Sequence, residues 1–150
     1  MKKIIICLMG ILLLTGCSNN NTSASNTLDS KKASKSLDTE MKDMVVLEDK
    51  ELEAIYGLDL SLMDEYIIKS NSNRNGYIYA IIKVSKENKD EVKKQMDNLF
   101  ETLKTQSNLY SPEAVEILDN KVQTSIGDYL IYIAYKDTDK AYELVKENIK

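Results

Sequence analysis

The sequence contains no histidine and no tryptophan, and only two cysteines, Cys7 and Cys17. Without histidine a Ser–His–Asp triad cannot be built, and general acid–base catalysis loses its most frequent group. Histidine and cysteine are also the main ligands of zinc and copper, so their scarcity excludes nearly all sites for these metals. We therefore expect no cofactor and no metal centre.

Glycine and proline are scarce too, with five residues and one. The glycines beyond residue 16 are isolated, so no Gly-rich phosphate loop and no Gly-x-Ser-x-Gly elbow is present. Acids are plentiful, which keeps a carboxylate pair for glycoside hydrolysis open, although most acids fall on the predicted outer faces of helices. Asp59, Asp64 and Glu65 cluster without the residue spacing of a calcium loop.

The first 16 residues have the pattern of a secretory signal. Two lysines precede an apolar run over 4–14, and the chain after residue 17 is polar. This run of about 11 residues is shorter than the roughly 17–25 that a membrane span needs. At its end, Leu14-Thr15-Gly16-Cys17 resembles the lipobox of bacterial lipoproteins. The resemblance implies cleavage between Gly16 and Cys17 and a diacylglyceryl group on the Cys17 thiol; a membrane anchor, or a plain secretory signal cut elsewhere, is the alternative.

The charge that remains after such cleavage limits the partners. The remaining 134 residues carry 18 basic and 24 acidic side chains, a formal charge of −6, because Lys2 and Lys3 are the only charges removed. This acid excess argues against a nucleic-acid partner and against electrostatic adhesion to anionic lipid. Stable attachment to a membrane needs more than one acyl chain, and a diacylglyceryl group places two acyl chains on one sulfur. We expect the protein on the extracytoplasmic face of the cell membrane, anchored by lipid.

Composition divides the rest of the chain into a linker and one domain. Residues 17–36 combine the lipidated cysteine with a flexible polar linker, because serine, asparagine, threonine and lysine dominate there. Residues 37–150 have the length of a single domain. Its first helix is predicted from the helical spacing of Leu37, Met41, Met44 and Val45.

Periodicity predicts the other elements of the domain. Helices are expected over 49–56, after Asn88, after Ser111 and after residue 138, and strands over 65–69, 77–84, 121–126 and 129–135. The strands form two hairpins. We therefore predict an α+β fold with a four-stranded, mostly antiparallel sheet and helices packed on one face.

Four tyrosines form the candidate binding face of this sheet. Tyr77, Tyr79, Tyr129 and Tyr135 are expected on the less buried side of the hairpins, where aromatic rings can stack on sugars or pack against a protein. The candidate partners are therefore an envelope protein or a cell-wall glycan. The alternative is that tyrosine simply favours strands and lies half-exposed there.

Four short motifs occur in a fixed order along the domain. They are Leu52-x-x-Ile55-Tyr56-Gly57-Leu58-Asp59, Glu65-Tyr66-Ile67-Ile68, Tyr110-x-Pro112 and Gly127-x-Tyr129. Together they resemble a family of uncharacterised lipoproteins from Gram-positive bacteria called domain of unknown function 4358, over about residues 37–150. The resemblance implies a shared fold but no reaction or ligand. The chain departs from the family at Asn75-Gly76-Tyr77, where an acidic residue is usual.

Two classes of function follow. We expect a lipid-anchored, non-enzymatic binding or interaction module, whose ligand the sequence does not identify; an accessory in the folding or assembly of another envelope protein fits the same features. The alternative is a cell-envelope hydrolase that relies on carboxylates. It requires two acids about 5–9 Å apart in one cleft.

Overall fold

The computed structural model describes residues 27–150. The predicted signal, the cleavage site at Gly16 and the lipidation site at Cys17 lie outside these residues. No helix of the described part is long and apolar enough to cross a membrane. The elements are α1 (Ser30–Met41), β1 (Met44–Val46), α2 (Asp49–Ala54), a 3₁₀ turn (Leu60–Leu62), β2 (Glu65–Asn71), β3 (Ile78–Lys83), α3 (Lys89–Asn108), α4 (Pro112–Asp119), β4 (Val122–Ile126), β5 (Tyr129–Ala134) and α5 (Thr138–Lys146).

The fold is α+β, as predicted, but the sheet has five strands instead of four. All neighbours are antiparallel, in the order β1-β2-β3-β5-β4. The two predicted hairpins, β2–β3 and β4–β5, are both present and join through β3 and β5. The unpredicted strand β1 pairs with the outer edge of β2, where Met44 lies opposite Asn71.

Strand β1 was missed because its residues continue the helical spacing of α1. The helix ends at Met41, since Lys42 and Asp43 have φ angles of 50° and 51°, which no α-helix contains. The Asn71 side-chain amide donates a hydrogen bond to the Lys42 carbonyl oxygen (3.1 Å). The backbone N–H of Ser72 donates a second one to the Asp43 carbonyl oxygen (3.1 Å). These contacts turn the chain out of α1 and into the sheet.

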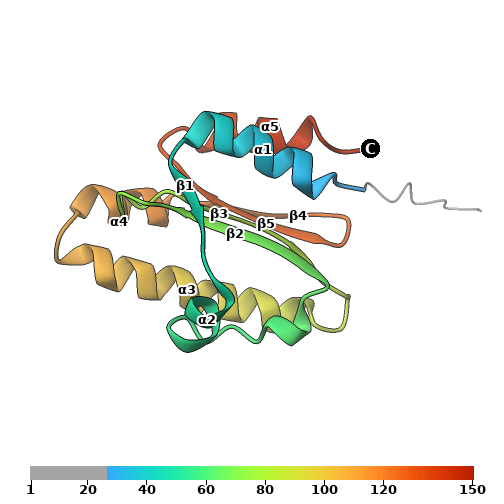
Figure 1. Ribbon diagram of the computed structural model, residues 1–150, viewed down its shortest axis with the longest axis horizontal. Coiled ribbons are helices and arrows are strands. Elements are labelled where there is room, and N and C mark those ends of the chain that lie inside the picture. The colour runs from blue at the N-terminus through green and yellow to red at the C-terminus, as the bar shows by residue number, and fades with distance from the viewer. Residues whose placement is uncertain (1–26) are drawn as a thin grey trace, which may run out of the picture.

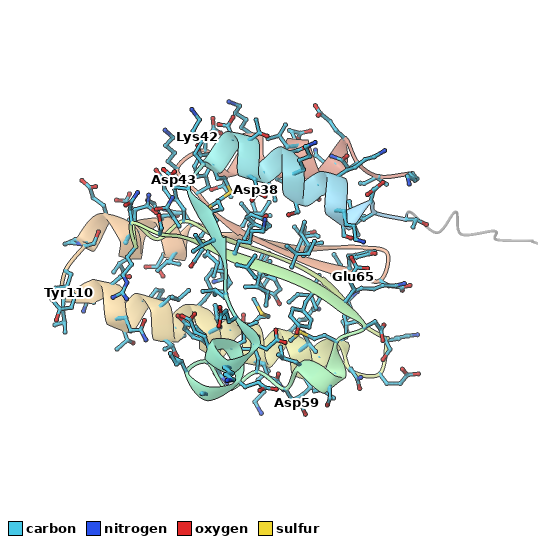
Figure 2. The ribbon with its side chains drawn as sticks, in the orientation of Figure 1. Asp38, Lys42, Asp43, Asp59, Glu65 and Tyr110 are labelled. Atoms are coloured by element: carbon cyan, nitrogen blue, oxygen red, sulfur yellow. The ribbon has the colours of Figure 1, made fainter. Side chains whose placement is uncertain are left out.

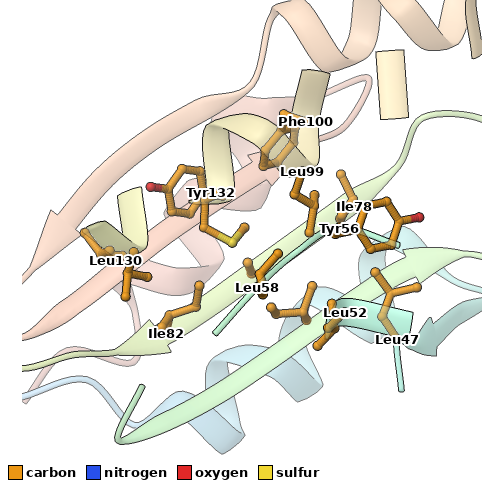
Figure 3. Packing of buried hydrophobic residues seen from close by; sticks show 14 of the residues in the cluster. Leu47, Leu52, Tyr56, Leu58, Ile78, Ile82, Leu99, Phe100, Leu130 and Tyr132 are labelled. Carbon is orange, nitrogen blue, oxygen red and sulfur yellow. The ribbon is translucent and has the colours of Figure 1, made fainter. Parts of the chain in front are cut away.

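Helices cover both faces of the sheet, so the prediction of helices on one face is wrong (Figure 1). Helices α1 and α5 lie on one side, and α2, α3 and α4 lie on the other. The reason is that the central strands are apolar on both sides: every residue of β5 is buried, and so is all of β3 except Lys83. Such strands need cover on both faces. Figure 3 shows the cluster beneath α2 and α3.

Most helices on the α3 side form as the sequence predicts. Gly57 ends the turn that follows α2 with a φ of 67°, and its N–H donates to the Glu53 carbonyl (3.1 Å), the single hydrogen bond of an αL helix end. The apolar stripe of α3 is fully buried except for its last member, Leu103; the other members are Val92, Met96, Leu99 and Phe100. Asn88 precedes α3, as expected, but its side chain forms no hydrogen bond with the first turn of the helix.

The predicted linker is wrong for its last residues, because the folded domain begins before residue 37. Leu28 is buried, and α1 starts at Ser30 after an Asp29 cap. The buried face of this turn of α1 consists mainly of small residues, Ala33 and Ser34 among them. Small and hydroxyl side chains resemble a polar linker in composition, yet here they permit close packing of the helix.

The two ends of the described chain lie side by side. Thr27 and Lys150 exchange backbone hydrogen bonds of 3.3 and 2.8 Å, and Leu28 forms a β-bridge with Ile149. The Lys150 ammonium also contacts the Asp29 carboxylate (3.2 Å). Residue 27 therefore enters the domain next to the C-terminus, beyond the ends of α1 and α5 (Figure 1).

Candidate functional site

Three of the four predicted binding tyrosines are structural. Tyr79, Tyr129 and Tyr135 lie under α1 and α5 and are between 0% and 7% exposed. The Tyr79 hydroxyl hydrogen-bonds with the hydroxyl of Ser34 (2.7 Å) and donates to the Asp38 carboxylate (2.8 Å). The predicted tyrosine face is therefore wrong as a binding surface, because these rings fill a core between the sheet and two helices.

The fourth tyrosine, Tyr77, lies at the border of that core. Its ring packs edge-on against Tyr135, with centroids 4.8 Å apart and an interplanar angle of 73°. Tyr77 keeps partial exposure and lines a separate cleft on the other side of the hairpin turn. This cleft, and not the covered sheet face, is the candidate site.

The cleft has a volume of about 730 Å³, within the range of pockets that hold small ligands. It lies between the end of α2, the turn that joins β2 to β3, and the connection from α3 to α4. Its lining comprises Glu51, Ile55, Tyr56, Ser70, Asn71, Arg74, Gly76, Tyr77, Ile78, Leu103, Gln106, Ser107, Leu109, Tyr110, Ser111 and Leu118.

One wall is the last turn of α2. Ile55 and Tyr56 precede the left-handed Gly57 that ends this turn. Tyr56 is 8% exposed, whereas Ile55 is 55% exposed. The short α2 thus presents an apolar side chain to solvent at the cleft.

The opposite wall is the tight connection between α3 and α4. The Ser107 carbonyl accepts hydrogen bonds from the backbone N–H groups of Tyr110 (2.9 Å) and Ser111 (2.8 Å). Ser111 then caps α4, accepting from the Ala114 N–H (3.3 Å). This turn leaves Leu109 78% exposed and Tyr110 86% exposed. Tyr110 projects at the end of the molecule farthest from the termini (Figure 2).

The floor is the turn between β2 and β3. Gly76 has a φ of 84°, and a Cβ atom there would lie 2.7 Å from the Ala114 carbonyl oxygen in α4. The glycine therefore lets the hairpin contact the α4 backbone and closes the cleft at this side. Arg74 sits in the same turn with a φ of 52°, a left-handed conformation that is uncommon for a residue with a side chain.

The charged groups of the cleft are few, since Glu51 and Arg74 are the only charged residues in its lining. Arg74 is the only arginine of the chain and forms no salt bridge with any described residue. Burial, followed by the Glu51 charge, raises the pKa of the Tyr56 phenol, and the positive charge of Arg74 opposes this shift. The phenol is therefore protonated at neutral pH and can donate a hydrogen bond. It has no hydrogen-bond partner within residues 27–150.

Acids are rare in the cleft. Glu51 is its one carboxylate, so the pair that the predicted hydrolase requires is not found in this lining. Of the acidic cluster considered above, Asp59 caps the 3₁₀ turn and Glu65 accepts a hydrogen bond from Ser30. Within the described chain no group of three histidine, cysteine, aspartate or glutamate residues is arranged to hold a metal ion.

Sequence reasoning missed the cleft because its residues come from four separate segments. One signal was present: Leu109 and Tyr110 are large apolar residues between Ser107 and the Ser111-Pro112 helix start. Connections between helices are commonly polar, so two such residues there indicate an exposed apolar contact surface.

Comparison with known proteins agrees with the resemblance noted from the motifs. A family model matches residues 35–135, and this range contains every residue of the cleft but neither α5 nor the predicted lipobox. No curated protein and no solved structure matches the chain. The match spans about two thirds of the sequence, and the chain therefore belongs to the family described as Domain of unknown function (DUF4358).

Proposed function

We propose that this protein is a lipoprotein held on the extracytoplasmic face of the cell membrane through Cys17, and that its domain is a non-enzymatic binding module whose ligand occupies the cleft. The lipobox pattern supports the anchor. The observation that carries the binding role is the clustering of exposed apolar side chains. Among residues 27–150, five large hydrophobic residues are exposed, and Ile55, Leu109 and Tyr110 all line the cleft.

Exposed apolar side chains gathered around one cleft are typical of a binding site, because domains in water seldom leave such a patch uncovered. Lys104 of α3 forms ion pairs with Asp119 of α4 (2.8 Å) and with Glu101 (2.7 Å), which connect the two helices on either side of the Leu109 turn. A cleft that is already formed by the folded domain would lower the ordering cost of binding.

The anchor is tested by intact-mass analysis of protein extracted from membranes. We expect a chain that begins at Cys17 and carries one added diacylglyceryl group, and we expect Cys17→Ala to lack both the cleavage and the lipid. Cys7→Ala is the matched control, because it changes the other cysteine and should keep the modification. A wild-type chain without the added mass, or cut at another position, would contradict the anchor.

The cleft is tested with Nile red, a neutral apolar dye that fluoresces when it leaves water. The protein lacking residues 1–17 is suitable, since both hydrophobic clusters are built from residues 28–149. The double variant Leu109→Ser, Tyr110→Ser should weaken dye binding by about tenfold or more, because each lost apolar contact is worth roughly 1.5 kcal/mol.

Val46→Ser is the matched control for this experiment. Val46 is 63% exposed on β1 and does not line the cleft, so its replacement should leave the dye affinity unchanged. Equal losses in the control and in the double variant would show that the dye does not use the cleft, and absence of dye binding would count against the proposed function.

A further inference from the structure

Resting on the proposed cleft function, we infer that the ligand is an apolar peptide segment that ends in a free carboxylate, with the carboxylate held by the Arg74 guanidinium and the Tyr56 hydroxyl. Both groups line the cleft and come from different elements, the β2–β3 turn and the end of α2. The guanidinium offers a fork of donors that matches a carboxylate, and the phenol adds one more donor.

The charge balance of the domain favours a ligand with a single negative charge. Acids outnumber bases in the chain by 24 to 20, so a polyanion would be repelled. Arg74 carries the only positive charge in the lining and Glu51 the only negative one. A ligand with apolar side chains and one terminal carboxylate complements this arrangement, whereas a segment with several acids would face Glu51.

The polar lining favours a peptide over an acyl chain. Gln106, Ser107 and Ser111 stand among the apolar walls. A peptide has backbone N–H and C=O groups that need partners when they leave water, and these side chains can supply them. An acyl chain would cover the same side chains without pairing them, which is unfavourable.

The backbone beside Arg74 is held by the side chain of a residue that lines the cleft, Asn71. In the described chain, the non-glycine residues with positive φ are Lys42, Asp43 and Arg74. All three meet at one corner, because the Asn71 side chain donates to the Lys42 carbonyl (3.1 Å) and accepts from the Asn73 N–H (2.8 Å) beside Arg74. Asn71 is itself part of the cleft lining.

The inference is tested by calorimetric titration of the protein lacking residues 1–17 with N-acetylated tetrapeptides. The set contains all combinations of Ala, Leu, Phe and Tyr, each with a free or an amidated C-terminus. We expect the best free acids to bind about tenfold or more tightly than their amides. Arg74→Gln should abolish this preference while leaving the affinity for the amides unchanged, and Tyr56→Phe should reduce it by a smaller factor.

Lys121→Gln is the matched control, because it removes a positive charge outside the cleft and should keep the preference for free acids. Equal binding of acids and amides, or no binding of either, would overturn the inference. Tighter binding of laurate than of every peptide would also overturn it. The same holds if amidated peptides that end in glutamate bind as tightly as the peptides with a free C-terminal carboxylate. Nile red binding that depends on Leu109 and Tyr110 would leave the proposed function standing in each of these cases.

Discussion

Replacement of Gly76 by alanine should lower the free energy of unfolding by roughly 2–5 kcal/mol. Two costs add at this position. The φ of 84° places an alanine in a conformation that disfavours a side chain, and its Cβ would lie 2.7 and 2.9 Å from the backbone of Ala114 in α4. Because backbone atoms cannot rotate away as a flexible side chain can, the hairpin turn or the helix must move.

Gly57→Ala provides the matched comparison. Gly57 has a similar φ of 67°, but nothing lies within 4 Å of the added Cβ. Only the conformational cost remains, and we expect a loss of about 1 kcal/mol. Urea denaturation measures both variants, through the shift of the midpoint at an unchanged slope. Equal losses in the two variants would mean that Gly76 does not form a close contact with α4.

Replacement of Leu28 by alanine should destabilise the domain by about 2–5 kcal/mol, the usual cost for a buried leucine. Leu28 is 3% exposed, belongs to the cluster beneath α1 and α5, and bridges Ile149. The same substitution in a flexible linker would cost nothing. Thermal or urea unfolding therefore distinguishes a domain that begins at Leu28 from the linker that composition predicts.

The control for this prediction is Lys31→Ala, an exposed position three residues further along the chain. Its replacement should change the free energy of unfolding by less than about 0.5 kcal/mol, as for most surface substitutions. If Leu28→Ala had an effect as small as Lys31→Ala, Leu28 would not be part of the core beneath α1 and α5, and its pairing with Ile149 would be refuted.

The sequence predicts best those elements whose residues carry a strong local pattern. The buried stripe of α3, the Ser111-Pro112 start of α4 and the two hairpins around Gly76 and Gly127 all follow from spacing or turn chemistry. The α+β class follows from their order. These features are local, so a single segment contains enough information to specify each of them.

Features that depend on tertiary contact were predicted poorly. The apolar alternation of β3 and β5 reveals two buried faces, but it does not show which helices cover them. Tyr79 resembles an exposed strand tyrosine in sequence, and only the partners Ser34 and Asp38 on α1 show that its hydroxyl is satisfied in the core. The cleft combines residues from four segments, and no local pattern links Arg74 to Tyr110.

The pairing of the two chain ends has a consequence for how an anchored domain is displayed. Residue 27 enters beside residue 150, at the opposite end of the long axis from Tyr110 (Figures 1 and 2). For a domain held from its N-terminal side, as proposed, the attachment would therefore lie at the end opposite the cleft and would not obstruct it. Tension along such an attachment would be borne first by the short strand pairing of Leu28 with Ile149, before it reached α1 or the walls of the cleft.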